Sequence, residues 1–201
     1  MNIIFVGVQG SGKGTQAKIV AEKMGLCHIS TGDLLRDATG ELGERVKKII
    51  ADGNLISDKL MLDILRERMS LGDCENGIIL DGFPRNLEQA KLLGLEIEIN
   101  KVVEIKISDE ESLRRLSGRV SCKDCGEGYN ICTAPRPKVL EKCDKCGGRL
   151  MQRADDNEDA IAKRIKTYHN ETEPILDFYG EKVVVIDGER EIGEISEDIL
   201  R

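Results

Sequence analysis

The chain has 201 residues, of which 40% are hydrophobic and 33% are charged, and its net charge is −7. This length suits one folded core with small insertions, and an acidic chain without a basic run argues against nonspecific nucleic-acid binding. No stretch approaches the roughly 20 apolar residues of a membrane helix, and no signal peptide is recognisable, so we expect a cytoplasmic protein with neither a nucleic-acid nor a membrane partner.

A glycine-rich loop follows the first apolar segment. Residues 2–6 are a short, mostly β-branched run, residues 7–15 contain the glycines and Lys13, and residues 16–24 have a helix-forming composition. In this order, backbone N–H groups and the helix N-terminus face a phosphate, and the lysine adds a full charge. A turn without a ligand is the disfavoured alternative. We predict a polyphosphate site made by Gly10, Ser11, Gly12, Lys13, Gly14 and Thr15.

This loop departs from its common form immediately after Lys13. The usual loop has Ser or Thr there, with its hydroxyl on magnesium, whereas this chain has Gly14 and only then Thr15. The variant resembles nucleoside monophosphate kinases, in which phosphates and water hold most of the magnesium. The departure favours a small-molecule kinase over a GTPase or a motor protein.

The rest of the chain alternates between strands and helices. Residues 27–30 read as the second strand, and residues 30–57 as an insertion of two short amphipathic helices, the second over 41–52. Further strands are expected at 77–81, 102–107 and 183–186, and helices at 58–71, 86–93, 109–117, 155–179 (broken at Pro174) and 191–200. This pattern predicts an α/β fold, with a five-stranded parallel sheet and helices on both faces.

The composition changes once more at a cysteine-containing module. We expect a core of residues 1–29, 58–118 and 153–201, the insertion 30–57, and a second insertion over 119–152. Ligands of parallel sheets lie at the carboxyl ends of the strands, where both the glycine loop and Asp81 fall.

A second anionic site is expected opposite the glycine loop, because phosphoryl transfer between two nucleotides requires neutralisation of charge on both sides. Arg36 follows a capped turn, and Arg85 follows Asp81 in a segment where Pro84 fixes the turn. Either arginine could instead be a solvated surface residue. Asp81 could pair with Arg85, but beside a phosphate loop we favour a role in orienting water on magnesium, which Asp33 could share.

Further arginines bracket the cysteine module. Arg115 and Arg119 are four residues apart, which predicts one shared helix face, and Arg153 and Arg164 follow the module. This arrangement suits a lid that closes over phosphates. Ordinary surface ion pairs with nearby acidic residues are the alternative.

Four of the seven cysteines occur in two Cys-x-x-Cys pairs. Such pairs place four thiolates around one ion, so Cys122, Cys125, Cys143 and Cys146 predict a closed, structural zinc site. Unligated thiols are the alternative. Cys27 and Cys74 stand apart in the sequence and are interpreted as small apolar residues.

Four motifs together resemble the adenylate kinases, in the bacterial long-lid form with a zinc-binding lid. They are residues 7–16 (Gly-x-x-Gly-x-Gly-Lys-Gly-Thr-Gln), 30–36 (Ser-Thr-Gly-Asp-Leu-Leu-Arg), 81–85 (Asp-Gly-Phe-Pro-Arg) and 153–158 (Arg-Ala-Asp-Asp-Asn-Glu). The resemblance implies reversible transfer from Mg-ATP to AMP giving two ADP, a P-loop kinase fold, Mg²⁺ and structural Zn²⁺ as cofactors, and a monomer.

The resemblance also implies individual roles. Lys13, Arg85, Arg119, Arg153 and Arg164 would be the catalytic residues. Asp33 and Asp81 would hold water molecules on the magnesium ion. ATP would bind the loop residues Gly10–Thr15 with Arg115, Arg119, Gly128, Tyr129 and Arg190. AMP would bind Thr31, Arg36, Asn54, Leu55, Ile56, Gly82, Phe83, Pro84, Arg85, Gln89, Arg153 and Arg164. Asp155 and Asp156 would join the hinge and its ion pairs, while Val120 and Gln9 replace a common arginine and proline.

Two other functions remain open from the sequence. One is a kinase for a different nucleoside monophosphate, since Thr31 and Gln89 favour adenine without ranking acceptors. The other is a zinc-ribbon nucleotide switch that binds a macromolecule. A switch hydrolyses ATP without AMP, whereas the kinase consumes ATP only when AMP is present.

Overall fold

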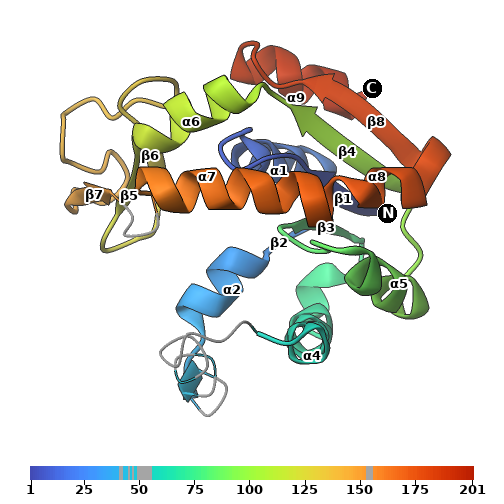
Figure 1. The fold of residues 1–201 in the computed structure, drawn as a ribbon. Helices are drawn as coiled ribbons and strands as arrows, with labels where there is room; N and C mark the ends of the chain where they lie inside the picture. Colours follow the sequence, from blue (N-terminus) through green and yellow to red (C-terminus); the bar gives the residue numbers. More distant parts are fainter. Residues whose placement is uncertain (41–42, 45, 47, 49–55, 153–155) are drawn as a thin grey trace.

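The computed structural model describes residues 1–40, 43–44, 46, 48, 56–152 and 156–201 (Figure 1). The first half contains β1 (Asn2–Val6), α1 (Lys13–Met24), β2 (Cys27–Ser30), α2 (Thr31–Asp37), α4 (Asp58–Met69), the 3₁₀ turn η1 (Gly72–Cys74), β3 (Ile78–Asp81) and α5 (Leu87–Glu96). The second half contains β4 (Lys101–Lys106), α6 (Asp109–Ser117), β5 (Arg119–Cys122), β6 (Gly128–Asn130), β7 (Leu150–Gln152), α7 (Glu158–Thr167), the π turn η2 (Tyr168–Thr172), α8 (Pro174–Tyr179), the 3₁₀ turn η3 (Gly180–Lys182), β8 (Val183–Asp187) and α9 (Ile192–Leu200).

The predicted parallel sheet is confirmed. Its five strands lie in the order β2-β3-β1-β4-β8 and all neighbours are parallel. Ile4 of the central strand pairs with Leu80 on one side and Val102 on the other, and all three side chains are fully buried. Strands covered on both faces read as continuous apolar runs, which is why the sequence identifies them. Their carboxyl ends meet at one edge of the sheet.

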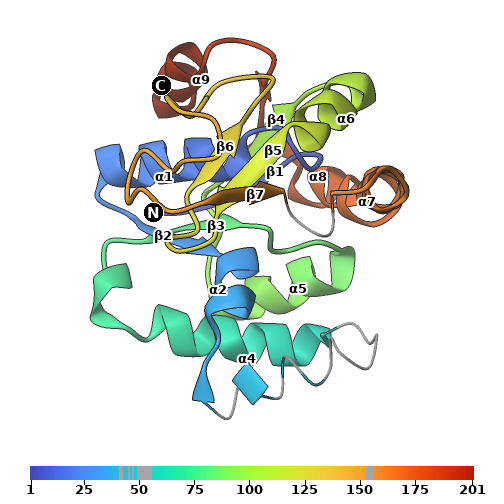
Figure 2. The same cartoon turned by 90° about the vertical axis from the view of Figure 1, so that its left-hand side faces the viewer.

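Alternate side chains of β1 divide the core into two layers. Ile3 and Phe5 pack against α1 and α9, whereas Ile4 and Val6 face the cluster formed with α4, α5 and α8. Helices therefore cover both faces, as predicted (Figures 1 and 2). No helix in the described part of the chain is long and apolar enough to cross a membrane.

The cysteine module forms a separate small sheet beside the core, with the antiparallel order β6-β5-β7. Figure 2 shows this sheet nearest the viewer, with α2 and α4 below it. The expectation that Arg115 and Arg119 share a helix face is wrong, because α6 ends at Ser117 and Arg119 begins β5. Gly118 follows the helix as its C-cap, and a Cβ atom there would lie 2.7 Å from the Asn130 side-chain oxygen. The predicted helix over 41–52 lies largely outside the described residues.

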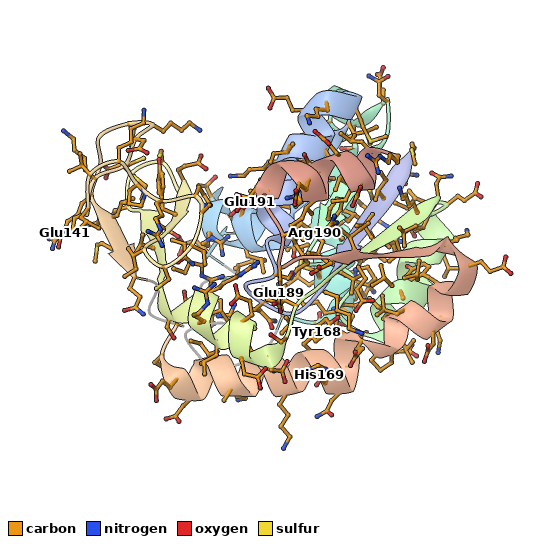
Figure 3. All side chains as sticks on the ribbon, turned by 90° about the horizontal axis from the view of Figure 1, so that it is seen from above. Glu141, Tyr168, His169, Glu189, Arg190 and Glu191 are labelled. Atoms are coloured by element: carbon orange, nitrogen blue, oxygen red, sulfur yellow. The ribbon has the colours of Figure 1, made fainter. Side chains whose placement is uncertain are left out.

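The predicted long helix over 155–179 is interrupted, as expected near Pro174. The helix α7 gives way to the π turn, and Pro174 then occupies the first turn of α8, where its missing N–H costs nothing. His169 lies on this turn (Figure 3), 2.8 Å from the Glu173 carboxylate and 3.0 Å from Asp109 at the start of α6. It therefore connects α6 with the helix that follows the lid.

This contact should make stability depend on pH. Hydrogen bonds to Glu173 and then Asp109 raise the pKa of His169 above 6.5, so the stabilisation is complete below pH 6.5 and is lost as pH rises through the raised pKa. The side chain is 41% exposed, so we expect an effect of only about 2 °C in unfolding temperature. Unfolding temperatures of the wild type and His169→Gln, measured from pH 5.5 to 8.5, should converge at the alkaline end. A constant difference would contradict the charge-dependent contact, and Asp109→Asn/Glu173→Gln should remove the same dependence.

Candidate functional site

The glycine loop connects β1 to the N-terminus of α1. A Cβ atom at Gly7 would lie 2.4 Å from the Ile105 carbonyl oxygen, and Gly12, the N-cap of α1, has a left-handed φ of 95°. Both positions require glycine. The Ser11 hydroxyl is buried and has no hydrogen-bond partner among the described residues. A buried, unpartnered donor at the positive end of a helix fits a phosphate ligand.

Lys13 points back into this loop. Its ammonium group donates to the carbonyl oxygens of Gly7 at 2.6 Å and Val8 at 2.9 Å. Burial lowers the pKa of Lys13 to about 8; Asp81 opposes this, while Arg85, Arg119 and Arg164 lower the pKa further. The last three residues come from different parts of the chain. Four of the five predicted catalytic residues, Lys13 and these three arginines, thus influence one another electrostatically.

Three of the predicted AMP contacts, Thr31, Gly82 and Arg85, meet at the carboxyl end of β3. The buried Thr31 hydroxyl donates to the Gly82 carbonyl oxygen at 2.9 Å, and Arg85 Nε donates to the same oxygen at 2.7 Å. Removal from water lowers the pKa of Arg85, against the influence of Asp81, and the nearby Arg164 and Arg36 lower it further. Cations that repel one another in this way favour a bound anion.

Asp81 and Asp33, both predicted to orient water on magnesium, lie in different surroundings. A Cβ atom on Gly14 would lie 3.2 Å from the Asp81 carboxylate, so this acid is adjacent to the phosphate loop. A carboxylate at that position fits water-mediated contact with magnesium. Asp33 forms an ion pair with Arg36 one turn along α2, and its backbone N–H donates to the Ser30 hydroxyl. Arg36 and Asp33 are therefore already partnered with each other.

One buried carboxylate holds two of the predicted catalytic arginines. Arg119 donates to both oxygens of Asp156, at 2.8 and 2.5 Å, and Arg164 donates to one of them at 3.0 Å. The Asp156 side chain is completely inaccessible to solvent. A bidentate pair of this kind fixes the plane of the guanidinium group. Arg153, predicted to act with them, lies outside the described residues.

A cleft with a volume of about 280 Å³ lies behind the loop, next to α6 and the start of α9. Arg115 and Arg190, both predicted ATP contacts, line it. Arg115 donates to Glu111 at 2.6 Å and to the Gly188 carbonyl oxygen at 2.9 Å, which ties α6 to the turn after β8. In Figure 3, Arg190 lies on the loop between β8 and α9.

Several lining residues of this cleft were not identified from the sequence, namely Thr133, Ala134 and Gly188. Gly188 follows the carboxyl end of a parallel strand, a position at which ligands are expected. Its place in the sequence could therefore have identified it. Thr133 and Ala134 belong to the lid, and no local pattern indicated them. Gly128 and Tyr129, predicted ATP contacts, do not line the cleft.

The remaining predicted AMP contacts lie beyond β3 or in the insertion. Phe83 and Pro84 are buried, so side chains there belong to the core. Gln89 accepts a hydrogen bond from the Arg85 N–H at 2.7 Å and donates to Asp58 at 2.7 Å. Its amide is thus occupied at both ends. Ile56 packs against the core, while Asn54 and Leu55, like Asp155, lie outside the described residues.

The four paired cysteines come together in the lid. Their sulfur atoms all lie within 4.8 Å of one another, with Cys122 and Cys146 separated by 3.4 Å and Cys125 and Cys143 by 3.6 Å. Four convergent thiols at these spacings could bind zinc. Tyr129 packs beside them, with its hydroxyl 3.6 Å from the Cys143 sulfur, so it belongs to the core of the lid.

The chain matches the family model described as adenylate kinase over residues 5–184. It is 45% identical to an adenylate kinase of Methanothrix thermoacetophila, in a match that covers 100% of this chain and 97% of that protein. It is 43% identical to one of Archaeoglobus fulgidus, covering 99% and 96%, and 40% identical to one of Caldicellulosiruptor bescii, covering 100% and 98%. The similarity extends over nearly the full length of these relatives.

The lowered pKa of Lys13 predicts a pH-dependent affinity for the polyphosphate. A group with a pKa of about 8 loses its charge above that pH, so ATP affinity should fall by about tenfold between pH 7 and pH 9. Titration calorimetry in two buffers of different ionisation enthalpy should show proton uptake on binding near pH 9. Lys13→Arg keeps its charge throughout this range and should lose the dependence. Equal slopes in the two proteins would contradict this assignment.

Proposed function

The chain belongs to the adenylate kinase family, whose reaction converts ATP and AMP to two ADP, and from that premise we propose how its residues divide the work. The observation that carries the proposal is that Lys13 lies within electrostatic reach of Arg85, Arg119 and Arg164 as well as of Asp81. Phosphoryl transfer needs such positive charge, because negative charge is spread over the migrating group in the transition state.

The donor nucleotide would occupy the glycine loop and the cleft next to it. Its phosphates would accept from loop N–H groups, the Ser11 hydroxyl and Lys13, and its base would lie between Arg115 and the 188–192 turn. Bound magnesium supplies charge neutralisation on the phosphates. Asp81 is placed to hold water on that ion, and Asp33, paired with Arg36, is placed less directly.

The acceptor would bind with its phosphate between Thr31, Gly82 and Arg85, where the Thr31 and Arg85 donors already converge on one carbonyl oxygen. An oxygen of the AMP phosphate would then attack the γ-phosphorus of ATP, and the bond to the bridging oxygen would break. Arg119 and Arg164, oriented by Asp156, would face the transferred group from the lid side.

Gln89 would have to exchange a present hydrogen bond in order to read adenine, because both ends of its amide have partners. We propose that its contact with the Arg85 N–H also positions that arginine. In this scheme residues 30–57 act as the AMP-binding insertion and residues 119–152 as a lid over the core of residues 1–29, 58–118 and 153–201. The Glu127 carboxylate of the lid lies 3.8 Å from Lys18 of α1, so the lid contacts the helix that follows the loop.

We also propose that the four lid cysteines hold one structural zinc ion. Four thiolates fill a tetrahedral shell, which leaves no open position for substrate. Tyr129, Val120 and Leu150 are the apolar support of this small sheet, too little to fold it by burial alone. A cytoplasmic, monomeric enzyme completes the proposal.

Arg85→Lys tests the acceptor assignment. Lysine cannot reproduce two parallel bonds to a phosphate, so the KM for AMP should rise by about tenfold or more while the KM for ATP changes by less than about threefold. A coupled assay of ADP formation gives both constants, and ADP should not accumulate from ATP without AMP. Arg66→Lys is the matched control, because Arg66 binds Glu96 and Asp63 on the outer surface. An equal rise in both KM values would overturn the assignment.

Loss of the zinc ligands tests the structural role of the metal. Cys143→Ser/Cys146→Ser should release one zinc per chain and lower the unfolding temperature by on the order of 5–10 °C, because metal binding contributes to folding free energy. Turnover should fall by less than about tenfold where the variant is still folded, since none of the cysteines is among the residues proposed to bind phosphate. Metal analysis, calorimetry and the coupled assay report these quantities, and Cys132→Ser should behave as wild type. A metal-free wild type, or abolished turnover in a folded variant, would contradict the proposal.

A further inference from the structure

Two cysteines outside the lid are neighbours in space. Cys27 begins β2 and Cys74 ends the 3₁₀ turn before β3, 47 positions along the chain, yet their sulfur atoms are 2.6 Å apart. Both pack in the hydrophobic core, as expected of small apolar residues, but the expectation that they stand apart is wrong. Cys27 is buried and Cys74 is half-buried.

The backbone of Gly77 forms hydrogen bonds with both cysteines. The Gly77 carbonyl oxygen accepts from the Cys27 N–H at 3.0 Å, and the Gly77 N–H donates to the Cys74 carbonyl oxygen at 3.1 Å. Because Gly77 directly precedes β3, the neighbour of β2 in the sheet, both cysteines are fixed relative to the same strand pair. Their juxtaposition does not depend on a mobile loop.

The spacing of the sulfur atoms distinguishes this pair from the lid cysteines. Two thiolates bound to one zinc ion at about 2.3 Å are separated by roughly 3.8 Å, near the 3.4 and 3.6 Å seen in the lid. Cys27 and Cys74 are much closer than that. A disulfide, with its bond of about 2.05 Å, needs only a small further approach.

The surrounding charges also disfavour a metal ion. Asp73, the third potential ligand at this position, is bound by both terminal nitrogens of Arg68 at 2.8 and 2.7 Å. One of these nitrogens lies 3.3 Å from the Cys74 sulfur. A guanidinium group thus occupies the polar side of the pair, where a metal ion would have to bind, and like charges repel.

We propose that Cys27 and Cys74 are a modification site that forms an intramolecular disulfide. The oxidant is a low-molecular-weight disulfide of the glutathione type. A thiolate of the pair attacks it and displaces one thiol; the second cysteine then attacks the mixed disulfide and displaces the other. One S–S bond breaks and one forms, and the two hydrogens of the protein thiols end on the two released thiols. The reagent gains the two electrons that the protein loses.

This bond would close a loop that contains the whole insertion 30–57. The closed loop restricts the unfolded chain and so stabilises the fold. Cys27 lies at the amino end of β2, whereas Ser30 and the site residues lie at its carboxyl end. The disulfide should therefore raise the unfolding temperature without changing turnover.

Mass spectrometry of the full-length, zinc-loaded chain tests the proposal directly. After incubation with oxidised glutathione, the intact mass should fall by about 2 Da, the mass of two hydrogen atoms. Trypsin should release residues 24–36 linked to residues 69–85, and the unfolding temperature should exceed that of the reduced protein by roughly 5–10 °C. Cys132→Ser, which leaves the pair intact, should give the same link and the same shift.

Cys27→Ser/Cys74→Ser should show no dependence of the unfolding temperature on the oxidant. Cys74→Ser alone, at the less buried position, provides the same comparison if the double variant does not fold. Absence of the 24–36/69–85 link in oxidised wild type would overturn the proposal. So would a second equivalent of zinc per chain that is lost in Cys74→Ser, or a stabilisation by the oxidant that persists in that variant.

Discussion

The structure around the glycine loop has to accommodate several cations that repel one another. Burial is the main cause of the lowered pKa of Lys13, and the like charges of Arg85, Arg119 and Arg164 lower it further. Two carboxylates offset the repulsion: Asp81 beside the loop, and Asp156, which binds Arg164 and a lid arginine. We propose that two anionic nucleotides bound here would supply further negative charge. The parallel sheet serves this arrangement by ending its central strands at one edge.

Most of the fold could be predicted from short sequence patterns. The buried runs of β1, β3 and β4 are apolar because both of their faces are covered, so their composition alone identifies them. The glycine loop is also locally encoded, since the positive φ of Gly12 and the close approach at Gly7 restrict both positions to one residue type. The cysteine pairs are also recognisable locally, because a four-thiolate metal site would require this Cys-x-x-Cys spacing.

Features that depend on contacts distant in sequence were harder to predict. Spacing alone placed Arg119 on a helix, whereas Gly118 ends that helix and the arginine is fixed by Asp156, 37 positions away. Thr133 reaches the cleft only because the lid folds beside the core. The contact between Cys27 and Cys74 follows from the pairing of β2 with β3, which no pattern around either cysteine reveals.

The position of Arg119 at the first residue of β5 has a mechanical consequence. It directly follows Gly118, where the chain passes from the core helix into the lid. In any rotation of the lid about this junction, a residue next to the pivot sweeps a short arc, and the cysteine turns at the far end sweep a long one. A large displacement of the lid tip would thus accompany only a small displacement of the Arg119 guanidinium group. Such a rotation would leave the arginine within reach of Asp156 even where the cysteine turns move far.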